Sequence, residues 1–204
     1  MNNGSLRLES VLHGEGLCLV AGVDEAGRGP LAGPVVAAAC MIPKEVHLSG
    51  IRDSKLLSPE RRKKLFWTII RQTLVGVGVV GEKEIDRINI LNASLLAMRQ
   101  AVLALSVTPE FLFIDGHLAI DLPIPQTPIV KGDARLISIG AASIVAKVTR
   151  DEMMEDYDRQ YPHYGFRRHK GYPTPAHVAA LDAYGPCPIH RMSFAPVARA
   201  LSSG

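Results

Sequence analysis

The chain has 204 residues, of which 47% are hydrophobic and 21% charged, with a formal net charge of +3. This composition is typical of a globular protein, and the length allows one large domain or one domain with an appendage. No apolar run reaches the roughly 18–20 residues of a membrane helix, and the polar first ten residues lack the layout of a secretory signal. Three cysteines without metal-type spacing indicate reduced thiols, so we expect a cytoplasmic protein without a membrane partner.

Two apolar runs, residues 17–23 and 35–42, have the length of buried strands and flank a glycine-rich segment that begins with Asp24 and Glu25. Adjacent residues of a regular strand point to opposite faces of the sheet. We therefore expect the first strand to end or bulge at Glu25, so that both carboxylates reach one site. A helix through residues 61–71, capped by Ser58, and a third strand at 73–80 follow.

Helices and strands alternate in the rest of the chain. The hydrophobic pattern predicts a short helix at 82–88, an amphipathic helix at 92–105, strands at 110–114 and 129–130, and a long helix at 137–160. Thr174 and Pro175 introduce another helix, which Gly185 closes, and a last helix starts near Ser193. Strands first, then strands alternating with helices, favour an α/β domain with a mixed sheet.

Acidic residues follow three of the predicted strands: Asp24-Glu25, Asp115 and Asp133. Taken alone, Asp115 is more often part of an ordinary turn, and Asp133 more often a residue at the start of a helix. All three together favour a site beyond the carboxyl ends of the strands. Carboxylates without suitably placed His or Cys indicate Mg²⁺ or Mn²⁺ rather than zinc. Such a cluster supports hydrolysis of a phosphodiester by two metal ions.

The C-terminal part of the chain is basic and rich in tyrosine. From residue 161 onward there are five Lys or Arg against one acidic residue, and all five tyrosines lie between Tyr157 and Tyr184. Interleaved basic and aromatic residues suit a nucleic-acid backbone. A solvated basic surface, with the tyrosines half in the core, is an alternative of equal weight.

Gly27, Gly29 and Gly33 invite comparison with a dinucleotide-binding fingerprint. However, their spacing is G-x-G-x-x-x-G, prolines interrupt it at positions 30 and 34, and a strand follows in place of a helix. No helix N-terminus is then available for a pyrophosphate. We favour close approach of this backbone to a sugar-phosphate strand, with Arg28 supplying positive charge.

The stretch AGVDEAGRGPLAGPVVAAA (21–39) resembles the opening motif of bacterial ribonuclease HII, the type 2 ribonuclease H family. Further matching motifs follow in the family's order: DSKLLS (53–58), FIDG (113–116), VKGD (130–133), AASIVAKVTRD (141–151), HKGYPT (169–174) and HRMSFAP (190–196). The resemblance implies a three-layer ribonuclease H-like α/β fold, a mixed sheet flanked by helices, as a catalytic domain over residues 15–160. We expect a loose tail at 1–14 and a small helical C-terminal arm at 161–204, packed on the same domain.

The resemblance also implies a function. The family cleaves the RNA strand of RNA–DNA hybrids and incises on the 5′ side of a single ribonucleotide in duplex DNA, with two Mn²⁺ or Mg²⁺ ions. It implies four catalytic, metal-binding residues: Asp24, Glu25, Asp115 and Asp133. It implies substrate-binding residues that recognise the 2′-hydroxyl, the phosphates and the following deoxyribose: Gly27, Arg28, Gly29, Ser54, Lys55, Lys170 and Tyr172.

Three points stay open from the sequence. Another two-metal nuclease on the same fold would also carry acids at strand ends, and a catalytically silent duplex-binding module would lack at least one of them. Many family members place a serine three positions after the residue that matches Asp133, where this chain has Leu136. Nothing in the sequence suggests more than a monomer.

Overall fold

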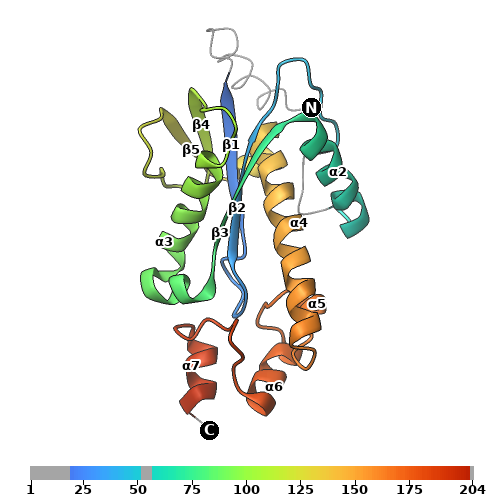
Figure 1. Ribbon diagram of the computed structural model, residues 1–204, viewed down its shortest axis with the longest axis vertical. Helices are drawn as coiled ribbons and strands as arrows, with labels where there is room; N and C mark the ends of the chain where they lie inside the picture. The colour runs from blue at the N-terminus through green and yellow to red at the C-terminus, as the bar shows by residue number, and fades with distance from the viewer. Residues whose placement is uncertain (1–18, 52–56, 203–204) are drawn as a thin grey trace.

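The computed structural model describes residues 19–51 and 57–202 (Figure 1). Its centre is a five-stranded sheet in the order β3-β2-β1-β4-β5. The strands are β1 (Val20–Ala26), β2 (Val35–Met41), β3 (Leu74–Val80), β4 (Phe111–Asp115) and β5 (Gln126–Ile129). β1, β2 and β3 pair antiparallel, whereas β1, β4 and β5 pair parallel. The predicted mixed sheet is confirmed.

The first strand does not end or bulge at Glu25, so that prediction was wrong. β1 stays in register with β2 through the pair Ala26 and Val36. Its pairing with β4 stops earlier, at Val23 and Ile114. Because β4 ends one residue later, the last part of β1 has a neighbour on one side alone. Because the neighbouring strand β4 is short, there is open space beside Asp24 and Glu25. β1 therefore reaches the site without the expected bulge.

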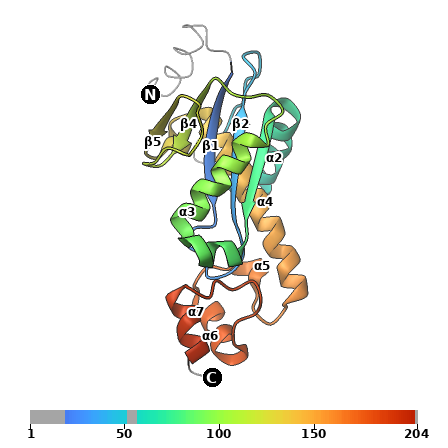
Figure 2. The ribbon, with the colours of Figure 1, turned by 60° about the vertical axis from the view of Figure 1, so that its left-hand side comes forward.

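Helices cover both faces of the sheet (Figures 1 and 2). α3 (Glu82–Leu103) lies on one face, and α2 (Pro59–Gln72) and α4 (Ile137–Gln160) lie on the other. A Cβ atom on Gly22 of β1 would come within 2.3 Å of the backbone of Ile139, so α4 packs directly against the strand. The small residues Ala141, Ala142 and Ala146 allow this approach, and all three are fully buried.

Most predicted helices occur where the pattern placed them. α4 has the predicted bounds, and α6 (Pro175–Tyr184) begins with the Thr174 hydroxyl accepting a hydrogen bond from the N–H group of His177. The two helices predicted at 82–88 and 92–105 form the single segment α3, which is kinked at Asn89, where φ is 67°.

The starts of two elements differ from the prediction, and two short helices were not predicted. β5 begins at Gln126 and includes Pro128, which an edge strand tolerates because one of its sides needs no ladder hydrogen bonds. α7 (Ala195–Ser202) starts after Ser193, whose N–H and hydroxyl groups bind the carboxylate of Asp86. The short helices η2 (Gly132–Ala134) and α5 (Phe166–His169) were not predicted, since three or four residues carry no readable period.

Leu136 occupies the N-cap position of α4 without a side-chain capping bond. Its side chain is buried in a cluster with Val20, Phe113 and Ile139. The start of this helix is therefore held by apolar packing, where a serine would offer a hydrogen bond.

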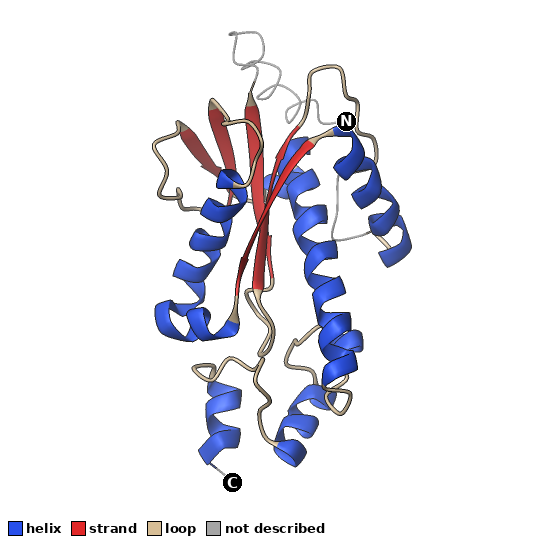
Figure 3. Ribbon diagram, viewed as in Figure 1, coloured by secondary structure: helices blue, strands red, loops and turns tan. Residues whose placement is uncertain are grey.

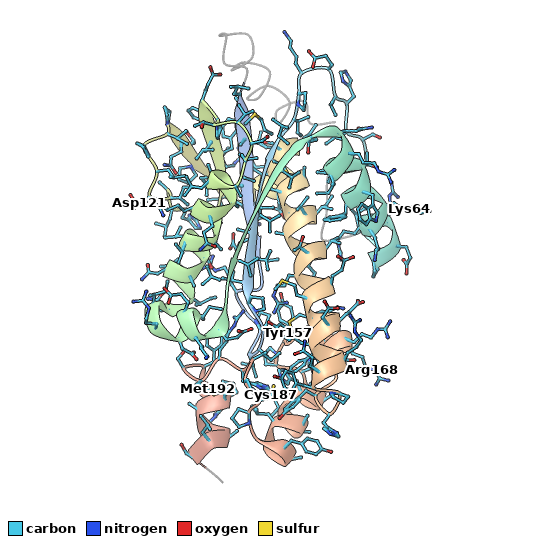
Figure 4. All side chains as sticks on the ribbon, in the orientation of Figure 1. Lys64, Asp121, Tyr157, Arg168, Cys187 and Met192 are labelled. Carbon is cyan, nitrogen blue, oxygen red and sulfur yellow. The ribbon has the colours of Figure 1, made fainter. Side chains whose placement is uncertain are left out.

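The C-terminal helices lie beyond one end of the sheet, next to the end of α4 (Figure 3). Tyr164, Phe166 and Ile189 form a buried cluster there with Met154 of α4 and Ala32 of the loop after β1. Figure 4 labels Tyr157 and Cys187, which both belong to this junction. The division at residues 160 and 161 stays a prediction, and the expected tail at 1–14 lies outside the described residues. Within the described part of the chain, no helix has the length and hydrophobicity needed to span a membrane.

Candidate active site

A pocket of about 400 Å³ lies where β1 continues past β4. It is bounded by the ends of β1 and β4, the loop after β1, α2, α4 and the C-terminal segment. Its lining residues are Asp24, Glu25, Ala26, Gly27, Arg28, Gly29, Arg62, Asp115, Ser143, Lys147 and Tyr172. Seven of the eleven predicted site residues therefore meet in one place.

Asp24 and Asp115 come from neighbouring parallel strands. The pairing of Val23 with Ile114 makes these two aspartates the next residues along each strand. Asp24 is 4% exposed; its Oδ1 accepts a hydrogen bond from the N–H group of Glu25 at 2.7 Å, and the Ser143 side chain also binds its carboxylate. Burial raises the pKa of Asp24 well above its ordinary value, and the negative charges of Glu25 and Asp115 raise it further.

Glu25 is also held in an environment that disfavours its negative charge. Burial raises its pKa, while the Arg28 guanidinium, 3.3 Å from Oε1, opposes that shift. Its second oxygen, Oε2, is buried and has no hydrogen-bond partner among the described residues. Burying a carboxylate oxygen without a partner is costly, so this position calls for a cation.

The donor set fits a hard divalent cation. Three carboxylates share the pocket, one of their oxygens lacks a partner, and oxygen ligands are those that Mg²⁺ and Mn²⁺ prefer. In their present positions, no three His, Cys, Asp or Glu side chains of residues 19–51 and 57–202 lie close enough together to bind one metal ion. The three carboxylates share the pocket but would have to move to coordinate the same ion. Asp115, for example, accepts a 2.6 Å hydrogen bond from the N–H group of Gly132.

Asp133 does not join the other three acids in the pocket. It lies in the η2 turn directly after Gly132, its side chain is buried, and it does not line the pocket. The pocket is thus lined by three of the four predicted carboxylates, and Asp133 is next in the chain to Gly132, whose N–H group binds Asp115. The metal-binding role of Asp133 stays a prediction.

The glycine loop (residues 27–34, after β1) requires a glycine at position 27, and at position 29 it lies in contact with Tyr172. Gly27 has φ of +101°, and a Cβ atom there would lie 2.1 Å from Nε of Arg150. A Cβ atom on Gly29 would lie 3.4 Å from the ring of Tyr172, which is 42% exposed. Tyr172 and Gly29 are therefore neighbours in the pocket although they are far apart in the sequence.

The remaining predicted residues lie elsewhere. Lys170 does not line the pocket; its ammonium binds Oε1 of Glu155 at 2.8 Å. A phosphate contact by Lys170 would require this ion pair to open. Ser54 and Lys55 lie outside the described residues.

Four lining residues were not predicted as site residues: Ala26, Arg62, Ser143 and Lys147. Ser143 and Lys147 are four residues apart on α4, a spacing that places both on one helix face. The motif AASIVAKVTRD contains that spacing, so it could have been read from the sequence. Arg62 belongs to a run of basic residues on α2, and nothing in that run distinguishes it.

Two buried histidines, His177 and His190, form a hydrogen-bonded series that ends on the backbone of Tyr172. Nδ1 of His177 lies 2.9 Å from the carbonyl oxygen of Tyr172, so Nδ1–H must donate there. Nε2 of His177 then accepts from Nε2–H of His190 at 3.0 Å, and Nδ1 of His190 accepts from the N–H group of Cys187. This pattern uses both imidazoles in their neutral form.

Lowering the pH should therefore destabilise the fold already at pH values above those at which carboxylates titrate. Burial lowers the pKa of His190 to about 4, and it also lowers the pKa of His177. Below the ordinary histidine pKa of about 6.5, the unfolded chain binds protons that the folded protein excludes. We expect the free energy of unfolding in urea to fall between pH 6.5 and 5.5, by roughly 1 kcal/mol per proton. In His190→Gln the free energy of unfolding should depend less on pH than in the wild type. The control His117→Gln replaces an exposed histidine and should keep the wild-type dependence. Equal dependence on pH in the wild type and both variants would contradict the neutral, buried state of His190.

Carboxylates at the ends of neighbouring strands of a mixed sheet, next to a basic and aromatic segment, define the class of ribonuclease H-like nucleases. The family model for ribonuclease HII matches residues 21–197. Ribonuclease HII of Acetivibrio thermocellus is 54% identical over 91% of this chain and 73% of its own length. That of Citrifermentans bemidjiense is 55% identical over 97% of this chain and 86% of its own.

A solved structure agrees with these relatives. The crystal structure of ribonuclease H2 from Pyrococcus horikoshii superposes with a TM-score of 0.76 at 30% identity, covering 90% of this chain and 97% of that one. The chain belongs to the ribonuclease HII family. It is thus a ribonuclease H, an endonuclease that hydrolyses phosphodiester bonds.

Proposed function

We propose that this enzyme hydrolyses the RNA strand of RNA–DNA hybrids and incises duplex DNA on the 5′ side of single ribonucleotides, leaving 3′-hydroxyl and 5′-phosphate ends. One observation carries the proposal: the carboxylates Asp24, Glu25 and Asp115 share a pocket with the glycine loop and Tyr172. Groups suited to phosphodiester hydrolysis and groups suited to reading a sugar thus meet at one place.

We propose that Asp24, Glu25 and Asp115, with Asp133 as a fourth ligand, hold two Mn²⁺ or Mg²⁺ ions. When bound, such ions generate hydroxide from water and stabilise the leaving oxygen. The buried Oε2 of Glu25, which has no hydrogen-bond partner among the described residues, supports Glu25 as a metal ligand.

The basic side chains around the carboxylates would hold the substrate. Arg28, Arg62 and Lys147 line the same pocket, where their positive charges favour a phosphodiester over a neutral ligand. Lys147 donates to Oδ1 of Asp151 at 2.7 Å, so, as for Lys170, a phosphate contact by its ammonium would require this ion pair to open or be shared. These contacts would position the strand and carry no information about its sugar.

The glycine loop and Tyr172 would supply that information. A 2′-hydroxyl is both a donor and an acceptor, so closely spaced backbone groups at Gly27, Arg28 and Gly29 can recognise it. The exposed ring of Tyr172 next to Gly29 offers a surface on which the sugar after the ribonucleotide can stack.

The duplex would continue along the C-terminal segment. A second pocket of about 790 Å³ there is lined by His163, Arg167 and Arg168 among others, and Figure 4 shows Arg168 pointing outward. These side chains fit a duplex backbone leaving the active site. We propose a monomer that acts in the cytoplasm, consistent with the free thiols of Cys40 and Cys187.

Tyr172→Ala should impair incision at single ribonucleotides more than cleavage of continuous RNA. Loss of stacking on one sugar should reduce kcat/KM at a single ribonucleotide about 10-fold, since such contacts contribute roughly 1–3 kcal/mol. A continuous RNA strand has no RNA-to-DNA junction to read, so its cleavage should fall less. The control is Tyr184→Ala, which removes an exposed tyrosine outside the pocket. Equal losses on the two substrates would remove the proposed role of Tyr172.

A further inference from the structure

The side chain of Arg191 is fully buried, yet all four of its hydrogen bonds among the described residues go to backbone carbonyls of the loop after β1. Nη2 donates to Gly27 at 2.6 Å, Nη1 to Arg28 at 3.0 Å and to Pro30 at 2.8 Å, and Nε to Gly33 at 2.9 Å. A planar guanidinium is the side chain that can serve so many acceptors in fixed directions.

These bonds determine which way the peptide groups of the loop face. In a planar trans peptide the carbonyl of one residue and the N–H of the next point in opposite directions. Since the carbonyls of Gly27 and Arg28 point at Arg191, the N–H groups of Arg28 and Gly29 point away from it. Both residues line the pocket, and neither N–H group has a hydrogen-bond acceptor among the described residues.

The guanidinium itself is held firmly. Its carbon lies 5.1 Å above the centre of the Phe194 ring, and the backbone N–H of Arg191 donates to the carbonyl of Leu31 at 2.8 Å. The same stretch of loop is tied to the region of Tyr172, because the N–H of Leu31 donates to the carbonyl of Gly171. Arg191 thus lies at the point where the glycine loop and the segment carrying Tyr172 meet.

We propose that Arg191 is the positioning residue of the glycine loop: by binding the carbonyls of Gly27 and Arg28, it presents two adjacent N–H groups to the ribose of the substrate and so sets the discrimination between ribonucleotide and deoxyribonucleotide. This inference rests on the proposed function. Arg191 is buried behind the loop and acts through its backbone.

The test uses two DNA duplexes that are identical except for one ribonucleotide, and three full-length proteins: wild type, Arg191→Lys and Arg199→Lys. Ca²⁺ replaces Mg²⁺, and a gel confirms that no strand is cut, so that dissociation constants are read without cleavage. A lysine keeps the charge but has three donors, so it cannot serve all four carbonyls. Arg199 is an exposed arginine of α7 outside the pocket and provides the matched control.

We expect the wild type and Arg199→Lys to prefer the ribonucleotide duplex by the same factor, and Arg191→Lys to lose roughly 10-fold of that preference, the size of one or two hydrogen bonds. A purely structural defect lowers the folded fraction for both duplexes alike and leaves the ratio of dissociation constants unchanged. A wild-type ratio in folded Arg191→Lys would overturn the proposal. Equal affinity of the wild type for both duplexes would contradict the proposed function itself and this inference with it.

Phe194→Leu answers the same question if Arg191→Lys does not fold. It keeps the guanidinium and an apolar side chain but removes the ring beneath the charge. We expect the preference for the ribonucleotide duplex to fall about 2–3-fold, a smaller effect because the hydrogen bonds remain possible. An unchanged preference in this variant would overturn the proposal.

Discussion

Asp24→Asn is expected to reduce kcat for cleavage of an RNA–DNA hybrid by more than about 100-fold at saturating Mg²⁺ or Mn²⁺. Substitution of groups that merely orient a metal ligand already costs about 10–100-fold, so loss of a ligand should cost more. The amide keeps the shape of the carboxylate and can still accept the hydrogen bond from the N–H group of Glu25. The loss should therefore appear in catalysis and metal affinity, measured by titrating each metal against the cleavage rate.

The fold of Asp24→Asn should be intact, and in EDTA its melting temperature should equal or exceed that of the wild type. Burial and the charges of Glu25 and Asp115 raise the pKa of Asp24, which means that its ionised form destabilises the metal-free protein at neutral pH. A neutral side chain removes that cost. Asp121→Asn, on an exposed loop labelled in Figure 4, is the control. Cleavage at the wild-type rate by Asp24→Asn would exclude Asp24 as a metal ligand.

Arg150→Ala is expected to lower the free energy of unfolding by roughly 3 kcal/mol or more. The Arg150 side chain is fully buried and donates to the backbone carbonyls of Pro34, Ala32 and Lys170 at 2.9–3.1 Å. Its removal leaves two buried acceptors and one partly buried acceptor without this donor, and each buried one costs about 1–3 kcal/mol. Urea unfolding at pH 7 measures the change directly.

The matched control for Arg150 lies on the same helix. Arg159 is exposed and forms a surface ion pair with Asp156, so Arg159→Ala should change stability by less than about 1 kcal/mol. Equal small losses for both variants would show that the loop after β1 does not depend on Arg150.

Long elements with a clear composition could be predicted from the sequence. α4 was predicted with its observed bounds because its first half is a run of small apolar residues, its second half is charged, and Tyr161-Pro162 ends it. The carboxylate pocket could also be predicted, since strands of a sheet bring Asp24 and Asp115 to one edge.

The rest depends on contacts that leave no local pattern. Arg150 and Arg191 donate to backbone carbonyls more than a hundred residues away in the sequence, and a carbonyl looks the same whatever residue carries it. The open side of β1 at Asp24 and Glu25 depends on where β4 ends, and β4 lies about 90 residues further along the chain. Likewise, Asp115 is the last residue of β4, whereas Asp133 lies in the short η2 turn, which the sequence did not predict.

The most direct test of the central claim uses the wild-type protein and a DNA duplex with a single ribonucleotide. With Mg²⁺ or Mn²⁺ we predict one nick on the 5′ side of the ribonucleotide, no nick in EDTA, and no cleavage of the same duplex made entirely of DNA. Failure to nick under either metal would contradict the proposed function. Equal cleavage of the all-DNA duplex would instead indicate a two-metal nuclease that does not read the 2′-hydroxyl.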